Sequence, residues 1–383
     1  MPRLKRSKTI ENWTNEILTS DSDIGDVETL FEVAATSLAQ ENPLNKINKQ
    51  LSSTQAMLIE ALKVKEISSN IKNEEDISKF STQVKILELA IDKRQKLHKE
   101  RTYFLEQKVA EAGIFAVQKN NRKKNDTGKI VRKIRKGTLR YTVGEELTPF
   151  DAKVLMSLHK LWENKGKTKE LTVNMYEILR ACHLTPSGDS YNLLENSLLR
   201  LFRAEVVLQD IGDNTEERTF IHLLQEVGFE RGRAEQGKDA KFTVMFTDRI
   251  YNSMAAGYFE RFSGALLADL SSGTAQILMI ALQPEFRKSI YEWTLDEVCL
   301  MIDLTSGRPS TRRTSIQKAL SELETYKHIS NYRIWDDYSG LTKVWATPGS
   351  ILLEEDIVIK DKWEQYSGEI KDWWLKNKST IDS

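Results

Sequence analysis

The chain has 383 residues, of which 40% are apolar, so it is long enough for two or three domains with their own cores and is not disordered as a whole. Lys and Arg total 56 and Asp and Glu also total 56, which excludes a strongly basic or acidic protein and makes any electrostatic footprint local. The two cysteines exclude a disulfide scaffold and a Cys-rich zinc module, and no stretch approaches the ~20 apolar residues of a membrane span, so we expect a soluble, cytoplasmic protein.

Residues 1–118 are predicted to form a helical domain for packing or assembly. A first run of apolar residues at helical spacing comprises Val27, Leu30, Phe31, Ala34 and Leu38. A second run comprises Met57, Leu58, Ala61 and Leu62. A long charged helix is expected from Phe80, with a partial stripe at Val84, Leu87, Ile91, Leu105 and Val109. Arg94, His98 and Arg101 interrupt that stripe, which argues against a strict coiled coil.

Residues 119–140 form a basic segment that we expect to be a linker arm. The segment has ten Lys and Arg residues and one acid, Asp126, while Gly128 and Gly137 interrupt any helix. Such an arm is either a solvated tether or a phosphate-binding element, because each phosphate that it neutralises releases condensed counterions. The candidate phosphate ligands are Arg132, Lys133, Arg135 and Lys136.

The remaining chain is predicted to contain one helical unit twice. The first copy is marked by Leu155, Leu158, Thr172, Ile178, Leu194, Leu198 and Leu201. The second copy is marked by Ile277, Ile280, Thr294, Leu300, Ile316, Leu320 and Leu323. The separation is constant, since 277 − 155 and 323 − 201 both equal 122. A shared offset across three successive helices indicates an internal repeat.

Strand signals follow the third helix of each copy. The first copy continues with "AEVVLQD", "RTFIHLLQEVGFERG" and "KFTVMFTDRIY", and the second with "ISNYRIWDD" and "LTKVWATP". Three helices followed by a β-hairpin are typical of a winged helix, whose third helix enters the major groove while the wing contacts the backbone or the minor groove. We therefore predict a mainly α chain with small β-wings (α+β): a helical N-terminal domain followed by two winged-helix domains, residues 141–264 and 265–350.

The stretch "GRPSTRRTSIQKAL", Gly307 to Leu320, is predicted to open the third helix of the second domain. Its apolar positions share one side and leave a polar, hydrogen-bonding face outside. The DNA-binding candidates are Ser310, Thr311, Arg312, Arg313, Thr314, Gln317, Lys318 and Ser321, together with Arg333 and Lys343 on the wing. Because Arg313 and Gln317 are four residues apart, we expect this pair to read adjacent bases and Arg312 to contact phosphate.

The third helix of the first domain is a poorer candidate reader. Its outward positions are predicted to be Asn192, Asn196, Arg200 and Arg203. Glu195 and Leu199 lie near the same side, and a carboxylate and an apolar side chain suit DNA less well. This helix is expected either to contact DNA or to serve contacts between subunits.

Other interpretations of these motifs compete with DNA binding. The string "RRTS" matches a basic-directed phosphorylation site, although Ser315 would lie inside a folded helix, and the polar face could be an ordinary solvated surface. The five histidines are scattered without metal spacing, and Cys182 beside His183 is expected in the core. We therefore predict no catalytic site, no metal, no cofactor and no enzymatic activity.

Residues 351–383 are predicted to end the chain with an amphipathic helix. Its apolar side carries Trp363, Tyr366, Ile370, Trp373 and Trp374. Large aromatic side chains are commonly buried, so this helix is expected to cover the core of the preceding domain, with docking of a partner as the alternative.

Four strings resemble the bacterial plasmid replication initiator (Rep) proteins built from tandem winged-helix domains. They are "ELTPFDAKVLMSLHKLWENKG", "LTVNMYEILRACHL", "SYNLLENSLLRLFRAEVVLQD" and "GRPSTRRTSIQKALSELETYKHI", within residues 140–350. The resemblance implies a bacterial cytoplasmic protein that binds repeated duplex DNA sites (iterons) at a plasmid origin, helps to melt the origin and recruits the host replicative helicase or its loader. It places the recognition helix at Ser310 to Tyr326. The helical region before the arm departs from the simplest members of the family.

Self-association is also expected, and two alternatives to an initiator stay open. One is a transcriptional regulator of similar architecture, and the other is a partner-binding scaffold in which the basic arm is only a tether. A regulator usually carries one reader and a ligand pocket or dimer helix, whereas this chain is predicted to carry two readers in series.

Overall fold

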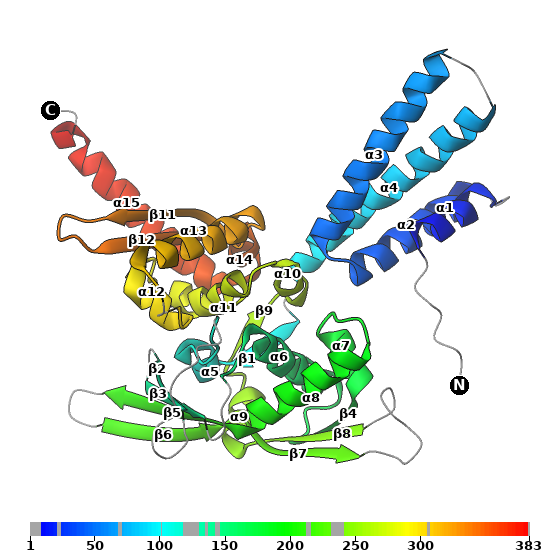
Figure 1. Cartoon of the computed structure of the whole chain (residues 1–383). Coiled ribbons are helices and arrows are strands. Elements are labelled where there is room, and N and C mark those ends of the chain that lie inside the picture. Colours follow the sequence, from blue (N-terminus) through cyan, green and yellow to red (C-terminus); the bar gives the residue numbers. More distant parts are fainter. Residues whose placement is uncertain are drawn as a thin grey trace. The chain divides into compact units, whose positions relative to one another are not determined.

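The structure is a computed structural model that describes residues 9–20, 24–67, 71–100, 102–117, 130–134, 137–141, 146–211, 216–230, 241–304 and 307–381. The chain forms two compact units, residues 1–100 and 101–383 (Figure 1). The described residues are mainly helical, and the strands among them pair in small antiparallel sheets. The predicted class, mainly α with small β elements, is confirmed.

The described part of the first unit consists of helices. They are α1 (Ile10–Leu18), α2 (Ile24–Glu41), α3 (Leu44–Ile67) and α4 (Ile71–Lys99). The first predicted apolar run lies on α2, where Phe31, Ala34 and Leu38 share a core with residues of α4. Met57 and Leu62 of the second run, on α3, are 41% and 45% exposed, so this run is not a buried stripe.

The N-terminal unit is shorter than the predicted residues 1–118. After α4 the chain continues as β1 (Tyr103–Glu106) and α5 (Gln107–Ala112), and β1 pairs with β9 (Phe259–Phe262). Leu105 and Val109 are therefore buried in the second unit and do not extend a stripe of α4. Gly264 lies so close to the Tyr103 ring that an added Cβ would collide with it. The boundary was misplaced because a partner strand far along the chain, and not local spacing, determines where residues 102–117 pack.

The part of the basic segment 119–140 that the structure describes is not a plain linker. Its described residues form β2 (Ile130–Ile134) and β3 (Gly137–Tyr141), which pair with each other. β3 also pairs with β5 (Ala204–Ile211), and β5 pairs with β6 (Glu216–His222), so the sheet has the order β2-β3-β5-β6. Strand pairing satisfies backbone groups that would face water in a tether, and here it joins the described part of the segment to β5.

Two modules with the same order of elements make up most of the second unit (Figure 1). The first contains α6 (Pro149–Asn164), β4 (Glu170–Asn174), α7 (Met175–Ala181), α8 (Gly188–Arg203), β7 (Leu224–Glu230) and β8 (Lys241–Phe246). The second contains α11 (Gly273–Arg287), β10 (Glu292–Thr294), α12 (Leu295–Met301), α13 (Pro309–Thr325), β11 (Ile329–Asp336) and β12 (Thr342–Pro348). Their sheets have matching strand orders, β4-β8-β7 and β10-β12-β11. Each module therefore has the predicted order of three helices followed by a β-hairpin, and its assignment as a winged helix stays a prediction.

Further elements lie after α8 in the first module and between the two modules. The β5–β6 hairpin is inserted after α8, and α9 (Asp248–Ala255) and α10 (Gly264–Asp269) flank β9. The run predicted as one strand from Arg218 to Gly232 is two strands, because Leu223 separates β6 from β7 and the two belong to different sheets. The sequence did not predict this change of sheet, because the apolar run continues through it without a turn residue.

The internal repeat is confirmed for the first and third helices and shifted for the second. Leu155 and Leu194 are buried, as are their predicted counterparts 122 residues later. The second helices are instead separated by 120, since their N-caps are Asn174 and Thr294 (294 − 174), each in a capping box with a Glu. The predicted counterparts Thr172 and Thr294 are therefore displaced by two residues. Between the helix bounds, the connection before the second helix is three residues shorter in the second module (288–294 against 165–174), and the connection after it is one residue longer (302–308 against 182–187).

The tail helix packs on the second module. α14 (Ser350–Glu355) leads into α15 (Ile357–Ile381), whose Ile359 is buried. The rings of Trp363 and Tyr366 lie 5.3 and 4.4 Å from the ring of Tyr291. The predicted covering role is confirmed for this part of the helix. Ile370 is 41% exposed, and the side chains of Trp373 and Trp374 lie outside the described set.

Trp363→Ala is expected to lower the free energy of unfolding by about 2 kcal/mol, because it removes a partly buried aromatic ring that contacts Tyr291. Thermal unfolding of the full chain measures the change. Ile370→Ala, an exposed position on the same helix, is the matched control and should stay within about 0.5 kcal/mol of the parent. Equal effects at both positions would contradict a covering role.

Candidate nucleic-acid interface

Helix α13 begins and packs as its sequence predicts. Gly307 has a φ of +94°, a conformation that suits glycine, and turns the chain before the helix. Pro309 occupies the first helical position, where a backbone N–H would have no partner within the helix, so the N–H that proline lacks costs no hydrogen bond. The buried residues are Ile316, Ala319, Leu320 and Leu323. This side packs toward α11 and β11, so the opposite side faces solvent.

The outward side of α13 is polar, as predicted. The exposed residues at its centre are Ser310, Thr311, Thr314, Gln317, Lys318, Ser321 and Thr325, and Glu324 is exposed at its edge. The Thr314 and Thr325 hydroxyls donate to the carbonyls of Ser310 and Ser321 at 3.0 and 2.8 Å, so each keeps acceptor lone pairs for a ligand. Glu322 accepts a hydrogen bond from the backbone N–H of Ser271, which engages this carboxylate inside the module.

The two arginines at the start of α13 are both bonded to carboxylates of the same module. Arg312 Nη1 donates to Asp296 Oδ1 of α12 at 2.8 Å, and the Arg312 side chain is 17% exposed. Arg313 Nη1 lies 3.1 and 3.0 Å from the two carboxylate oxygens of Asp336, at the end of β11. Arg313 Nη2 also donates to the Ile334 carbonyl at 3.2 Å. Sequence reasoning identified the arginines and missed both carboxylates.

The wing is a hairpin with an ordered turn. The Asp337 carboxylate accepts hydrogen bonds from the Ser339 hydroxyl and from the N–H groups of Ser339 and Leu341, and the Ser339 hydroxyl contributes most to lowering the pKa of Asp337. Arg333 is exposed, with its guanidinium 5.6 Å from the Trp335 ring. Lys343 forms an ion pair with Glu292 at 3.3 Å. Of the two predicted wing cations, Arg333 is the more accessible.

In the first module, α8 presents Asn192, Asn196 and Arg203 to solvent, as expected. The predicted outward position of Arg200 is wrong, because its side chain is 11% exposed and its Nε and Nη2 donate to Asp151 of α6 at 2.9–3.2 Å. Asp151 is fully buried, and a buried carboxylate requires such a partner. The helical wheel gave no sign of this partner, which comes from another helix.

The arm candidates are only partly described. Arg132 and Lys133 lie on β2, opposite Leu139 and Thr138 of β3, and β2 is an edge strand of its sheet. Arg135 and Lys136 lie outside the described residues. Two of the four arm candidates, Arg132 and Lys133, therefore lie on the edge strand of a sheet, and the structure does not describe the other two.

No protein-family model and no curated protein matches the chain. The solved structures that are similar to it include two of domains 2 and 3 of RctB. A selenomethionine crystal structure of domains 2 and 3 of RctB is 12% identical and has a TM-score of 0.45, covering 63% of this chain and 98% of that one. A second crystal structure of RctB domains 2–3 is 11% identical with a TM-score of 0.44, covering 67% of this chain and 100% of that one.

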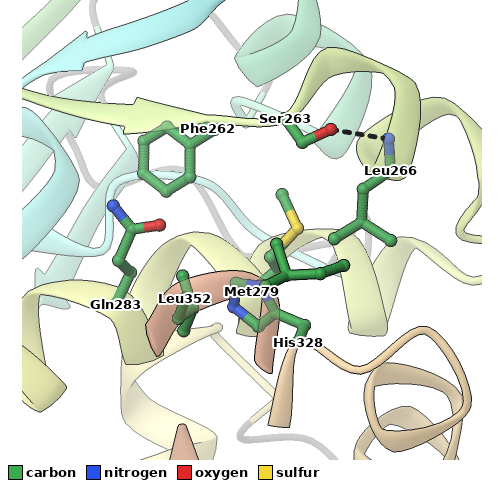
Figure 2. A pocket seen from close by; sticks show the side chains of 8 residues that line it. Phe262, Ser263, Leu266, Met279, Gln283, His328 and Leu352 are labelled. Carbon is green, nitrogen blue, oxygen red and sulfur yellow. Dashed lines mark hydrogen bonds between the residues drawn. The ribbon is translucent and has the colours of Figure 1, made fainter. Parts of the chain in front are cut away.

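A small cavity lies among residues of β9, α10, α11 and α14 (Figure 2). It is lined by Phe262, Ser263, Leu266, Met279, Gln283, His328, Ile351 and Leu352. Its volume of about 10 Å³ has room for about one water molecule, which excludes it as a pocket for a small-molecule ligand. The Ser263 hydroxyl accepts from the Leu266 N–H at 3.1 Å and caps α10, a structural role.

Two titratable groups that could suggest catalysis are core residues. The ring of His159 donates from Nδ1 to the Phe104 carbonyl at 2.9 Å, and burial lowers the pKa of His159 to about 4. Burial raises the pKa of the Cys182 thiol to about 11, so this residue is protonated at neutral pH and lies in the core as expected.

Within the described part of the chain, no cluster of three or more His, Cys, Asp or Glu is arranged to hold a metal. Among those residues, no helix has both the length and the apolar character needed to cross a membrane.

Proposed function

We propose that this protein is a non-enzymatic replication initiator that binds repeated duplex DNA sites at a plasmid origin through its two winged-helix modules. The observation that carries the proposal is the outward face of α13, which offers hydroxyls, the Gln317 amide and the Lys318 ammonium beside a wing. Hydroxyl and amide groups can bond base edges in the major groove, which admits an α-helix. The first module has a helix in the same position, so one chain offers two contacts to a duplex.

The two modules in series favour an initiator over a transcriptional regulator. A regulator usually combines one reader with an effector pocket or a dimer helix, whereas this chain has two modules that could each present a helix to a duplex. Self-association on neighbouring repeats, melting of the origin and recruitment of the host replicative helicase or its loader belong to the same proposal.

Selection of bound duplexes from a random-sequence pool by the full-length protein tests this function. We expect one sequence to be enriched and bound at least ~10³-fold more tightly than random duplex at the same salt concentration. An initiator further requires direct repeats of that sequence beside the reading frame, whereas a single isolated site would favour a regulator. A scaffold would enrich no duplex, which would refute DNA recognition.

Replacing Arg132, Lys133, Arg135 and Lys136 with alanine is expected to weaken binding to every duplex alike. Each lost phosphate contact leaves counterions condensed, so the slope of log affinity against log salt should flatten by ~0.9 per contact. Fluorescence anisotropy with the selected and the random duplex, over a series of salt concentrations, measures both slopes. Alanine at the exposed residues Lys46, Lys49 and Lys63 of the first unit is the control, with no change expected. An unchanged slope in the arm variant would leave the segment a structural hairpin.

A further inference from the structure

The adjacent arginines of α13 connect this helix to its neighbours on two sides. Consecutive helical residues point about 100° apart, so the two side chains reach different elements. Arg312 reaches Asp296 in the first turn of α12, and Arg313 reaches Asp336 at the end of β11. Asp336 also accepts from the Thr342 hydroxyl at 2.7 Å, at the start of β12. Arg313 is thereby linked to both strands of the wing.

The position of Asp336 calls for an explanation, because a carboxylate beside a DNA-binding helix repels phosphate. Its bonds with Thr342 and Arg313 lower the pKa of Asp336, so it is ionised at neutral pH. The Asp336 side chain is 57% exposed, and an exposed ion pair contributes little to folding stability. A purely stabilising role therefore does not account for it, whereas a geometric role does.

We propose that Arg312 and Arg313 are positioning residues that brace α13 between α12 and the wing, while bases are read by Thr314, Gln317, Lys318 and Ser321. This inference rests on the proposed DNA-binding function. The brace holds the wing at one angle to α13 in the free protein. The entropy cost of ordering the wing and the helix when DNA binds is therefore smaller. It assigns the exposed carboxylates of Asp296 and Asp336 to the orientation of the DNA-binding helix.

The competing mechanism is that Arg313 leaves Asp336 and binds a guanine with its guanidinium fork. The two mechanisms predict opposite effects for Asp336→Ala. If Arg313 is a brace, removing Asp336 loosens the wing and weakens specific binding. If Arg313 is a reader, removing Asp336 releases the guanidinium, also removes a charge that repels phosphate, and so strengthens binding.

The experiment uses the duplex selected from the random pool, its single-base variants and a random duplex, all at one salt concentration. We expect Arg313→Ala and Asp336→Ala each to lower the ratio of specific to random affinity about three- to tenfold, by the same factor on every single-base variant. The double variant should be no weaker than either single one, since both remove the same link. Asp296→Ala and Arg312→Ala are expected to behave as a second such pair.

Thermal unfolding of each variant should match the parent, which separates a change of orientation from a loss of fold. Asp248→Ala, which removes the exposed partner of Lys169 in the first module, is the matched control and should leave the affinity ratio unchanged. Binding by Asp336→Ala that equals or exceeds that of the parent would overturn the brace alone. So would a loss of discrimination confined to one base pair in Arg313→Ala. A pool from which no duplex is enriched would instead overturn the proposed function, and the brace with it.

Discussion

Gln317→Ala is expected to remove most of the discrimination at one base pair while the affinity for random duplex is retained. Gln317 is exposed on the outward face of α13, one turn beyond Arg313. A glutamine amide can bond adenine through N6 and N7, and such a bidentate contact contributes ~1 to 3 kcal/mol against the wrong base. Because no phosphate contact is lost, the salt dependence should match that of the parent. Affinities at fixed salt for the selected duplex, its single-base variants and a random duplex measure the effect.

Glu324→Ala is the matched control for this prediction, because Glu324 is exposed on the same helix and carries no group that could donate to phosphate. Removing its negative charge should raise the affinity for all duplexes slightly and leave discrimination intact. If Gln317→Ala still distinguishes every base pair as the parent does, this residue reads no base. Thr314→Ala and Ser321→Ala then decide whether any position on this face does.

The helices and their buried sides could be predicted, because the spacing of apolar residues within each helix indicates them. Leu194, Leu198 and Leu201 are buried on α8 as their spacing indicates, and the equivalent positions of α13 are buried too. The parts that could not be predicted depend on strands that meet from distant positions. β1 pairs with β9, and β3 with β5, and nothing in the local sequence of either pair names its partner. Residues 102–117 and the strands β2 and β3 of the basic segment therefore pair or pack in a context that their local sequence did not indicate.

In the candidate site, too, the features that depend on local spacing could be predicted and those that depend on distant residues could not. The helical wheel identifies the outward residues of α13 because it requires only one buried side. It cannot identify ion-pair partners, because a wheel gives the direction of Arg313 but not the strand end that brings Asp336 there. The error at Arg200 has the same origin, since its partner Asp151 comes from another helix. An arginine on a predicted recognition helix is thus a candidate reader only until the acids of neighbouring elements have been placed.

Asp151→Ala is expected to give the largest loss of stability, about 3–5 kcal/mol of the free energy of unfolding. The Asp151 carboxylate is fully buried and accepts bonds from Arg200, from the Ser197 hydroxyl at 2.5 Å and from the Thr148 N–H at 2.6 Å. It therefore ties the start of α6 to α8. The substitution removes the carboxylate partner of Arg200, whose side chain is only 11% exposed, and it also removes half of the capping box of α6.

Denaturant unfolding of the full chain, followed by the fluorescence of its tryptophans, measures this change. Buried Trp162, on the same helix as Asp151, should report it directly. Arg203→Ala is the matched control, because Arg203 is exposed near the end of α8 and its loss should change the free energy of unfolding by about 0.5 kcal/mol at most. Asp151→Asn keeps the shape and some acceptor capacity, so it should lose less than the alanine variant. If Asp151→Ala is no less stable than the Arg203→Ala control, the buried pair does not anchor α8, and Arg200 returns to the candidates for contact with DNA.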